Sequence, residues 1–310
     1  VGGYFFAQIH AQIKSLSANI LHVPGRKKLA TETAVEPKIR IESIHKSYFI
    51  DGAQQEVLAG VDLVVNAGEF VSIVGPSGCG KSTLLNIIAG LDQPDSGSVE
   101  LASERPGELL KTAGERLGQT GYMQQKDLLL PWRSVLDNTI LGLELKGLSK
   151  KQAREQALEY TEAFGLKGFE HHYPFALSGG MRQRAAFLRT MLMDQDVVLL
   201  DEPFGALDAL TRIQMQEWLL QLWESLSKTI VLITHDVDEA LLLSDRVYLM
   251  SARPGRATLV LDVDLPRPRH YDMVTTPDFS TLKAQLMEPL RAQTQTFKFQ
   301  AIKSVGQAGS

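Results

Sequence analysis

Apolar and polar positions change their spacing from one region of the chain to the next. Residues 39–41 alternate as Ile-Arg-Ile, residues 61–65 form a second short apolar segment, and residues 70–74 form a nearly continuous apolar run that ends in glycine. Turns that contain Gly, Asn and Asp separate these segments. The pattern predicts a small β region that leads into a buried parallel strand.

Helical sequence alternates with two further apolar runs later in the chain. Residues 84–90 predict a helix directly after the first buried strand, and residues 150–163 are rich in helix formers. We therefore expect a mainly helical insert over about residues 128–176. Residues 197–200 and 229–234 predict two more buried strands, each preceded by helical sequence. The alternation predicts an α/β fold whose loops gather at the strand ends.

The first 37 residues differ from the rest. Aromatic residues stand at positions 4–6, polar residues interrupt any signal-peptide core, and a Thr-, Glu-, Ala- and Pro-containing stretch up to Pro37 predicts a linker. Apolar residues between these parts recur at helical spacing: Ile9, Ile13, Leu16 and Ile20. Two interpretations stay open, a one-sided helix that lies on a membrane or partner and an extension without a specific role.

Composition and charge narrow the class of protein. With 310 residues, 44% hydrophobic and 22% charged, the chain is long enough for one large or two small domains and is not of disordered or collagen-like composition. The net charge of −4 gives no reason to expect a nucleic-acid partner. The single cysteine, Cys79, cannot close an intrachain disulfide, so a reducing compartment is permitted. No run approaches the roughly 20 apolar residues of a membrane-spanning helix.

A glycine-rich loop follows the first buried strand. Residues 75–82 match the pattern G-x-x-x-x-G-K-[ST], and this loop lies between a predicted strand and a predicted helix. Its backbone N–H groups and the positive end of the helix would bind a triphosphate, with Lys81 on the β and γ phosphates and Ser82 on Mg²⁺. A structural glycine turn is the alternative, and Cys79 is expected to be a small filler. The predicted nucleotide-binding residues are Gly75, Pro76, Ser77, Gly78, Cys79, Gly80, Lys81, Ser82 and Thr83.

Two acidic residues and a histidine follow the later strands. Asp201 and Glu202 come directly after the run at 197–200, at the edge where α/β sheets bind ligands. We expect Asp201 to hold Mg²⁺ through water and Glu202 to orient or deprotonate the attacking water. The alternative is an acidic pair that caps the next helix. His235 follows the strand at 229–234 and is expected to contact a γ-phosphate oxygen, unless it has only a structural role.

A second glycine turn opens a helix at residues 177–184, which read Leu-Ser-Gly-Gly-Met-Arg-Gln-Arg. It is a second anion-binding set of amides, and one nucleotide has no obvious use for two such loops from one chain. Here the sequence resembles the ATP-binding subunit of ABC transporters, whose signature is LSGGQ, with Met181 in place of the usual glutamine. The resemblance implies that two cassettes pair head to tail. Each ATP then lies between the phosphate loop of one cassette and Ser178, Gly179 and Gly180 of the other.

The resemblance implies roles for further residues. Tyr48 matches the aromatic residue that stacks on adenine, although a core or surface role is the alternative. Gln125 matches the glutamine that touches Mg²⁺ and water and links to the membrane subunit; Gln124 is adjacent, and the distance from Pro131 favours Gln125. Asp208 matches the acidic residue of the loop that crosses the dimer interface.

The resemblance covers about residues 39–256 and implies the P-loop NTPase (RecA-like) fold, an α/β core with an antiparallel β subdomain and a helical subdomain insert. We therefore expect an N-terminal extension or linker over residues 1–37. We expect an ABC ATPase domain over residues 38–256, with its helical insert at about 128–176. A C-terminal tail is expected over residues 257–310.

Within the family, residues 125–138 and 265–269 resemble the importer branch that handles nitrate, sulfonates, taurine and pyrimidine-type precursors; for Trp132 the alternative is an ordinary core aromatic. The resemblance implies ATP hydrolysis with ATP and Mg²⁺ at the cytoplasmic face of the bacterial inner membrane. The implied partners are integral membrane permease subunits, a second cassette that is an identical chain or a paralogue, and, indirectly, an extracytoplasmic solute-binding protein. A soluble ABC ATPase that is not a transporter is the alternative.

Overall fold

The computed structural model describes residues 37–307 except positions 51, 104 and 227. The predicted N-terminal extension and its helical pattern therefore lie outside the described residues, apart from Pro37. The described chain forms two compact units: a helix-rich unit of residues 120–229, and a β-rich unit of residues 37–119 together with residues from 230 onward. The division into extension, ATPase domain and tail stays a prediction.

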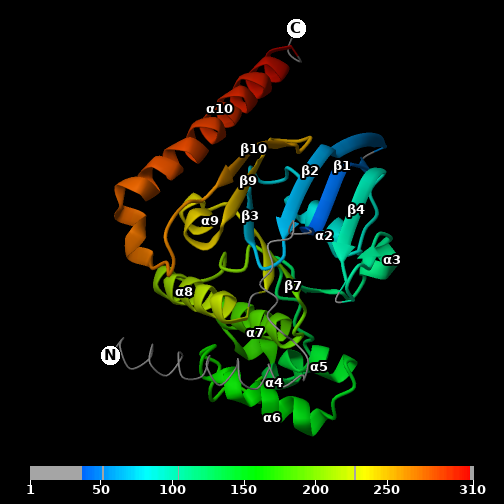
Figure 1. Cartoon of the computed structure of the whole chain (residues 1–310), viewed down its shortest axis with the longest axis vertical. Helices are drawn as coiled ribbons and strands as arrows, with labels where there is room; N and C mark the ends of the chain where they lie inside the picture. Colours follow the sequence, from blue (N-terminus) through cyan, green and yellow to red (C-terminus); the bar gives the residue numbers. More distant parts are fainter. Residues whose placement is uncertain (1–36, 51, 104, 227, 308–310) are drawn as a thin grey trace. The chain divides into compact units, whose positions relative to one another are not determined.

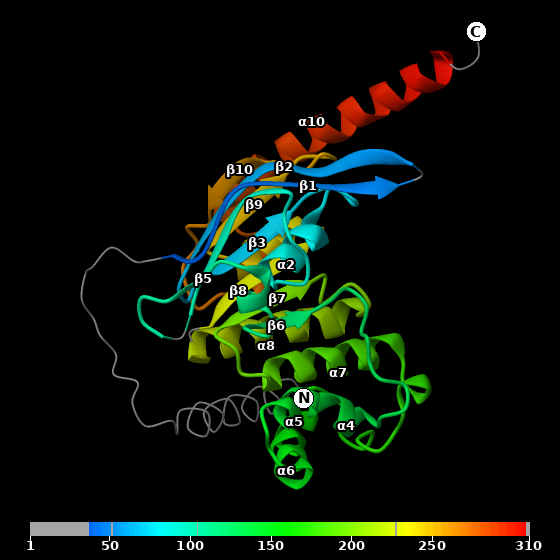
Figure 2. The ribbon, with the colours of Figure 1, turned by 90° about the vertical axis from the view of Figure 1, so that its right-hand side faces the viewer.

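An antiparallel sheet occupies the first half of the β-rich unit. Its strands, in the spatial order β2-β1-β4-β5, are β1 (Pro37–Ile50), β2 (Ala53–Asn66), β4 (Ser96–Ala102) and β5 (Leu109–Leu110). Strands β1 and β2 form the long hairpin seen in Figure 2. Ile39 and Ile41 are buried on one face, as their alternation predicts. The hairpin runs beyond the predicted apolar segments, because backbone pairing continues to Ile50 opposite Ala53.

Parallel strands form the buried centre of the β-rich unit. Strand β3 (Phe70–Val74) lies between β8 (Thr229–Thr234) and β9 (Arg246–Met250), parallel to both, and β10 (Ala257–Asp262) is antiparallel to β9. All five residues of β3 and all six of β8 are buried, which confirms the prediction that these apolar runs are core strands.

The β-rich unit also contains five helices among its described residues. They are α2 (Lys81–Ile88), α3 (Ala113–Arg116), α9 (Val237–Leu243), the 3-10 helix η2 (Tyr271–Thr275) and α10 (Pro277–Gln307). Helix α9 contacts β3, and α10, the long helix coloured orange to red in Figure 1, packs on α9. Residues expected only to form a tail therefore include a strand and a helix.

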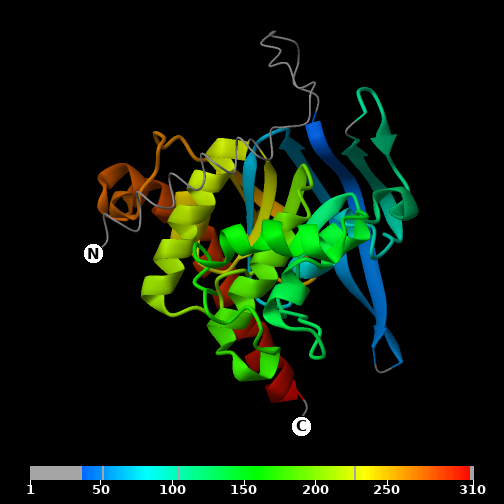
Figure 3. The same ribbon diagram turned by 90° about the horizontal axis from the view of Figure 1, so that it is seen from below.

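The helix-rich unit surrounds a two-stranded parallel pair. The strands are β6 (Thr120–Met123) and β7 (Val197–Asp201). The helices are α4 (Val135–Thr139), α5 (Leu141–Leu145), α6 (Lys150–Thr161), the 3-10 helix η1 (Pro174–Ala176), α7 (Gly179–Leu192) and α8 (Ala209–Leu226). Helices α4 and α5 contact α7, and α4, α5 and α6 contact one another; Figures 1 and 2 show this cluster, and Figure 3 shows it from below.

The core of the helix-rich unit contains a cluster of aromatic side chains. Phe164 lies edge-on to Trp218 with ring centroids 4.5 Å apart, and Phe187 lies edge-on to both rings. Such edge-to-face pairs add to the stabilisation from burial because the positive ring edge meets the negative ring face. Helix α6 begins at a capping box, in which Ser149 and Gln152 satisfy each other's backbone N–H groups. The sequence predicts a mainly helical segment for this region, and α4, α5, α6 and η1 all lie within it.

No helix among the described residues is both long enough and apolar enough to cross a bilayer.

Gly90 gives a test of the packing between α2 and α3. Its φ is +77°, and a Cβ there would lie 2.2 Å from the carbonyl oxygen of Ala113, a backbone atom. We expect Gly90→Ala to add a steric overlap of about 1–3 kcal/mol to the roughly 1–2 kcal/mol that a positive φ costs a residue with a Cβ. Thermal melting of the purified chain measures the loss.

Gly107→Ala is the matched control. Gly107 has nearly the same φ, +78°, but a Cβ there would have no atom within 4 Å. The Gly107→Ala variant should lower the melting temperature less than Gly90→Ala does. Equal decreases in melting temperature would mean that the close approach of Gly90 to α3 contributes nothing to the destabilisation.

Candidate nucleotide site

The glycine-rich loop joins a strand to a helix, as predicted. Strand β3 ends at Val74, the loop follows, and α2 begins at Lys81. Gly80 caps this helix with φ +106°, and a Cβ there would lie 2.6 Å from the Cδ2 atom of Leu58. The position therefore requires glycine for both its backbone conformation and its space. The loop thus leads directly into the N-terminus of α2, the end of a helix that favours an anion.

Lys81 is held over the start of this loop. It is 7% exposed, and its ammonium group donates to the carbonyl oxygens of Gly75 at 2.7 Å and Pro76 at 2.9 Å. The thiol of Cys79 is buried beside it, and burial raises the pKa of this thiol although Lys81 opposes the shift. The protonated thiol fits the predicted role of a small filler. Ser77, Gly78 and Ser82 are exposed, whereas Pro76 and Thr83 are half-buried.

Arg253 is a basic residue at this loop that the sequence patterns did not single out. It follows β9, and its guanidinium donates from Nε to the carbonyl oxygen of Gly78 at 3.0 Å. The same turn approaches the loop at Gly255, where a Cβ would lie 2.2 Å from the carbonyl oxygen of Cys79. The basic Arg-Pro-Gly-Arg run at 253–256 is the signal that could have found it.

Tyr48 lies near the other end of the loop. Its hydroxyl donates to Asp92 at 2.5 Å, and Lys46 lies with its Nζ 5.2 Å from the ring centroid. Burial, followed by the hydrogen bond to Asp92, raises the pKa of Tyr48 to about 12, while Thr83 of the phosphate loop lowers it. The half-buried ring is therefore fixed by its hydroxyl next to the predicted nucleotide-binding residues. The neighbouring Phe49 is 81% exposed.

Strand β7 delivers the predicted acidic pair in the helix-rich unit. Asp201 ends the strand and is 3% exposed, and Glu202 follows with φ +50°, a left-handed backbone conformation that is uncommon for a residue with a side chain. Gln125, which follows β6, donates from Nε2 to the Glu202 carboxylate at 3.1 Å. The structure thus brings together two residues that are 77 positions apart in sequence. The choice of Gln125 over Gln124 stays a prediction.

The acidic pair does not cap the next helix. Helix α8 begins at Ala209, and Asp208 accepts the backbone N–H of Thr211 at 3.0 Å. This hydrogen bonding lowers the pKa of Asp208. The helix-cap interpretation of Asp201 and Glu202 is therefore wrong, because Asp208 has that position.

The second glycine turn starts α7. Ser178 is its N-cap and accepts the N–H of Met181 at 3.2 Å, and Gly179 and Gly180 form the first turn. A Cβ at Gly180 would lie 3.4 Å from the Cδ2 atom of Leu207, in the loop that leads to Asp208. The signature residues and this loop therefore lie next to each other in the helix-rich unit.

His235 follows β8 in the β-rich unit and is exposed. Its neighbour Asp236 caps α9 by accepting the N–H groups of Asp238 and Glu239. The phosphate loop, Tyr48 and His235 thus belong to the β-rich unit. Gln125, Asp201, Glu202, the signature residues and Asp208 belong to the helix-rich unit.

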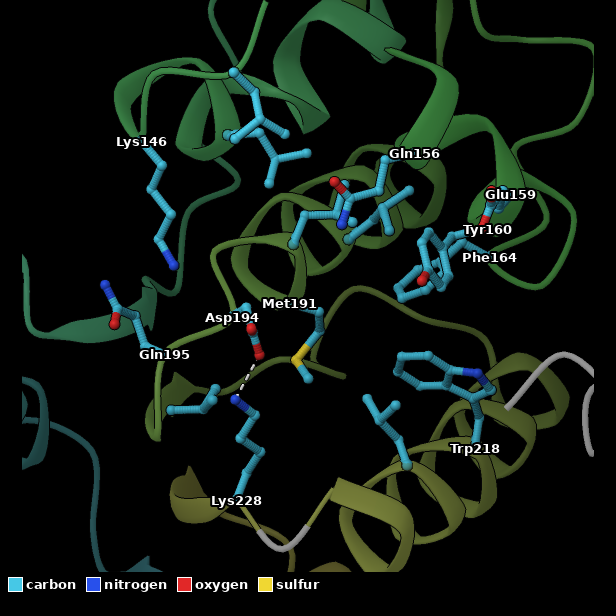
Figure 4. A pocket seen from close by; sticks show the side chains of 16 residues that line it. Lys146, Gln156, Glu159, Tyr160, Phe164, Met191, Asp194, Gln195, Trp218 and Lys228 are labelled. Carbon is cyan, nitrogen blue, oxygen red and sulfur yellow. Dashed lines mark hydrogen bonds and ion pairs between the residues drawn. The ribbon is translucent and has the colours of Figure 1, made fainter. Parts of the chain in front are cut away.

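A cavity of about 410 Å³ in the helix-rich unit is not this site. Figure 4 shows its lining, with Trp218 from α8, Met191 from α7 and Tyr160 from α6. The ion pair of Lys228 with Asp194, at 2.6 Å, is drawn there as a dashed line. The lining includes none of the residues predicted to bind nucleotide or water.

Comparison with known proteins places these features in one family. Residues 58–205 match the model of the family described as ABC transporter. An uncharacterized ABC transporter ATP-binding protein, MJ0412 of Methanocaldococcus jannaschii, is 46% identical over 75% of this chain and 84% of its own length. The aliphatic sulfonates import ATP-binding protein SsuB of Bacillus cereus is 40% identical over 81% of this chain and 94% of its own. The formylaminopyrimidine import ATP-binding protein ThiZ of Halalkalibacterium halodurans is 40% identical over 79% of this chain and 92% of its own length.

Solved structures agree with this assignment. The dimeric ATP-binding cassette MJ0796 in a post-hydrolysis state with ADP and Pi is 32% identical, with a TM-score of 0.66 over 74% of this chain and all of the other. A second dimeric structure of MJ0796 matches equally well. The fold is therefore that of an ABC ATPase cassette, as predicted. The chain belongs to the ATP-binding proteins of ABC transporters, and it is an ATPase that binds ATP.

Lys81→Ala should weaken ATP binding. A hydrogen bond to a charged partner contributes about 1.5–3 kcal/mol, so we expect Kd to rise about 10- to 150-fold. Fluorescent ATP-analogue titration measures this change. Lys111→Ala is the control, since Lys111 is an exposed lysine of the same unit that pairs with Glu100. Unchanged affinity in Lys81→Ala would contradict the phosphate-binding role.

Tyr48→Ala should also weaken ATP binding, because base-on-aromatic stacking contributes about 1–3 kcal/mol. Tyr48→Phe keeps the ring and loses only the hydrogen bond to Asp92, so it should bind ATP nearly as well as the original chain. Phe49→Ala is the matched control because successive strand residues face opposite sides. If Phe49→Ala weakened binding and Tyr48→Ala did not, the stacking residue would be Phe49.

Proposed function

We propose that this chain is the ATP-hydrolysing subunit of an ABC importer, in which two cassettes enclose ATP and drive solute uptake through a separate membrane permease. One observation carries the proposal: the chain has two sets of amides suited to anions, at residues 75–82 and at the start of α7, together with one acidic strand end. A single bound nucleotide accounts for only one of these sets. A second cassette that presents its Ser178, Gly179 and Gly180 to the first cassette's nucleotide accounts for both.

Positioning and charge stabilisation do most of the work in phosphoryl transfer, because the transition state is loose. In the proposed mechanism the loop amides and Lys81 hold the β and γ phosphates, and the partner's signature amides close the opposite side. Glu202 accepts a proton from the attacking water, and His235 donates a hydrogen bond to a γ-phosphate oxygen. Loss of the γ-phosphate removes the negative charge that joins the two positive surfaces, and the cassettes separate.

Mg²⁺ fits the donors that the chain offers. The hydroxyl of Ser82 is exposed at the start of α2, the amide of Gln125 is exposed beside Glu202, and the Asp201 carboxylate is buried at the end of β7. Oxygen donors of this kind suit Mg²⁺, which proteins usually bind through one or two carboxylates together with substrate phosphates. A bound ion would neutralise phosphate charge. We propose Ser82 and Gln125 as direct ligands, with Asp201 acting through water.

The partners follow from the importer assignment. We propose that the cassette lies peripherally on the cytoplasmic face of the inner membrane, where Gln125 and the helical insert at about 128–176 pass its motion to permease subunits. An extracytoplasmic binding protein delivers the solute. The relatives named for aliphatic sulfonates and formylaminopyrimidine support a solute of the nitrate, sulfonate and taurine type or a pyrimidine precursor.

Reconstitution in vesicles tests the importer function. The chain, its permease and the cognate binding protein are combined, and ATP turnover is measured with taurine, an alkanesulfonate, nitrate or formylaminopyrimidine. One of these solutes should stimulate ATP turnover. The same solute should accumulate on the side of the vesicle membrane opposite the binding protein. Turnover without any bound permease, or without response to solute, would favour a soluble ABC ATPase that is not a transporter.

Glu202→Gln should bind ATP but hydrolyse it about 10²- to 10⁴-fold more slowly, because the variant lacks the proton acceptor. Closed dimers should then accumulate with ATP, and size-exclusion chromatography with light scattering detects them. Glu155→Gln is the control, since Glu155 is an exposed carboxylate on α6 with only a weak 4.0 Å ion pair to Lys151. Normal turnover in Glu202→Gln would remove this residue as the base.

A further inference from the structure

A chain of contacts leads from Glu202 to the signature turn within the helix-rich unit. It begins with the hydrogen bond from Gln125 to the Glu202 carboxylate at 3.1 Å. Two residues after Gln125, the Asp127 carboxylate accepts a hydrogen bond from Nε of Arg182 at 3.0 Å. Arg182 lies on the first turns of α7, and it also donates to the carbonyl oxygen of Leu177 at 2.9 Å. Ser178 follows Leu177 directly, so the contacts run from the predicted base to the predicted signature serine.

A second arginine of α7 fixes the same loop. Arg189 donates to the carbonyl oxygens of Asp127 at 2.7 Å and Leu128 at 2.8 Å. Leu128 has φ +45°, a left-handed conformation that is rare for leucine. Backbone conformations of this kind persist only where surrounding contacts enforce them. The loop of residues 125–128 is therefore attached to α7 at two points and to Glu202 at a third.

The two ends of these contacts serve different nucleotides if the proposed function is correct. Glu202 acts on the ATP in the chain's own phosphate loop, whereas Ser178 acts on the ATP of the partner cassette. Arg182 and Asp127 thus connect α7 to the loop that holds Gln125 against Glu202. Neither Arg182 nor Asp127 belongs to the residues assigned to nucleotide, Mg²⁺ or water.

We propose that the ion pair of Arg182 and Asp127 is a positioning pair that couples the two ATP sites of the cassette dimer. This inference rests on the proposed function and adds a route of communication to it. Coupling between two sites requires an element whose arrangement both sites bias, and the loop of residues 125–128 is such an element. Coupling of this kind changes affinity by about 5- to 150-fold in typical proteins.

Asp127→Asn tests the pair with almost no change in side-chain shape. ATP turnover of the full chain with its permease is measured over a range of ATP concentrations. The original chain should show a sigmoidal dependence, and Asp127→Asn should lower the Hill coefficient toward 1 while turnover at saturating ATP changes much less. Asp127→Glu, which retains the carboxylate, should restore the sigmoidal dependence. A purely structural role would change kcat or stability without this selective loss.

Arg154→Gln is the matched control. Arg154 makes a two-point ion pair with Asp137, at 2.9 and 3.0 Å, in the same unit but away from the loop of residues 125–128. The Hill coefficient of Arg154→Gln should equal that of the original chain. If Asp127→Asn does not fold, Arg182→Lys replaces it, since lysine keeps the charge but cannot contact Asp127 and Leu177 with a planar fork.

The outcomes separate the coupling from the proposed function. An original chain that hydrolyses ATP without solute response or dimer formation contradicts the proposed function. An original chain that drives uptake but responds hyperbolically to ATP overturns the coupling alone. So does a sigmoidal dependence that survives in both Asp127→Asn and Arg182→Lys.

Discussion

Negative phosphate charge is met by fixed backbone N–H groups, and this requirement accounts for the glycine turns before α2 and α7. The turn before α2 favours glycine at position 80 because the backbone has φ +106° there and because Leu58 lies in the space that a side chain would take. The turn before α7 is capped by Ser178, and its two glycines leave the first amides of the helix uncovered by side chains. Each turn is the N-terminus of a helix, where unsatisfied N–H groups and the helix dipole both favour an anion. Their presence in one ATP-binding chain is the physical reason for the paired-cassette account.

The sequence was most informative where local chemistry and strand burial agree. The run at residues 70–74, the glycine loop and a helix after it were all predicted, because a continuous apolar run and a phosphate-binding pattern are local signals; the helix was expected over residues 84–90 and spans Lys81–Ile88. The strands at 96–102, 120–123 and 246–250 were not assigned. Strand β4 is held largely by pairing with β1, and its first residues, Ser96, Gly97 and Ser98, are exposed. Such a strand is stabilised by a distant partner and not by its own pattern.

In the candidate site, too, the sequence did not predict contacts between residues that are far apart along the chain. The pattern placed Asp201 and Glu202 at a strand end, yet only the structure shows that Gln125 contacts Glu202 and that Asp208 caps α8. Arg182 and Asp127 are 55 residues apart, and although each lies in a stretch that the sequence singled out, nothing in either stretch indicates that the two side chains meet. The tail after residue 257 had no predicted structure, because β10 alternates between half-buried and exposed positions and is fixed by its pairing with β9.

Mixing two inactive variants tests the central claim most directly. One variant carries Lys81→Ala and the other Ser178→Trp, so neither homodimer has an intact nucleotide site. A mixed dimer has one site with both defects and one site with an unaltered phosphate loop facing an unaltered signature. The account predicts that ATP turnover, absent from each variant alone, returns when the two are reassembled together with the permease. Failure of the mixture to regain any activity, while the unaltered chain reassembled in the same way is active, would contradict a nucleotide shared between two copies.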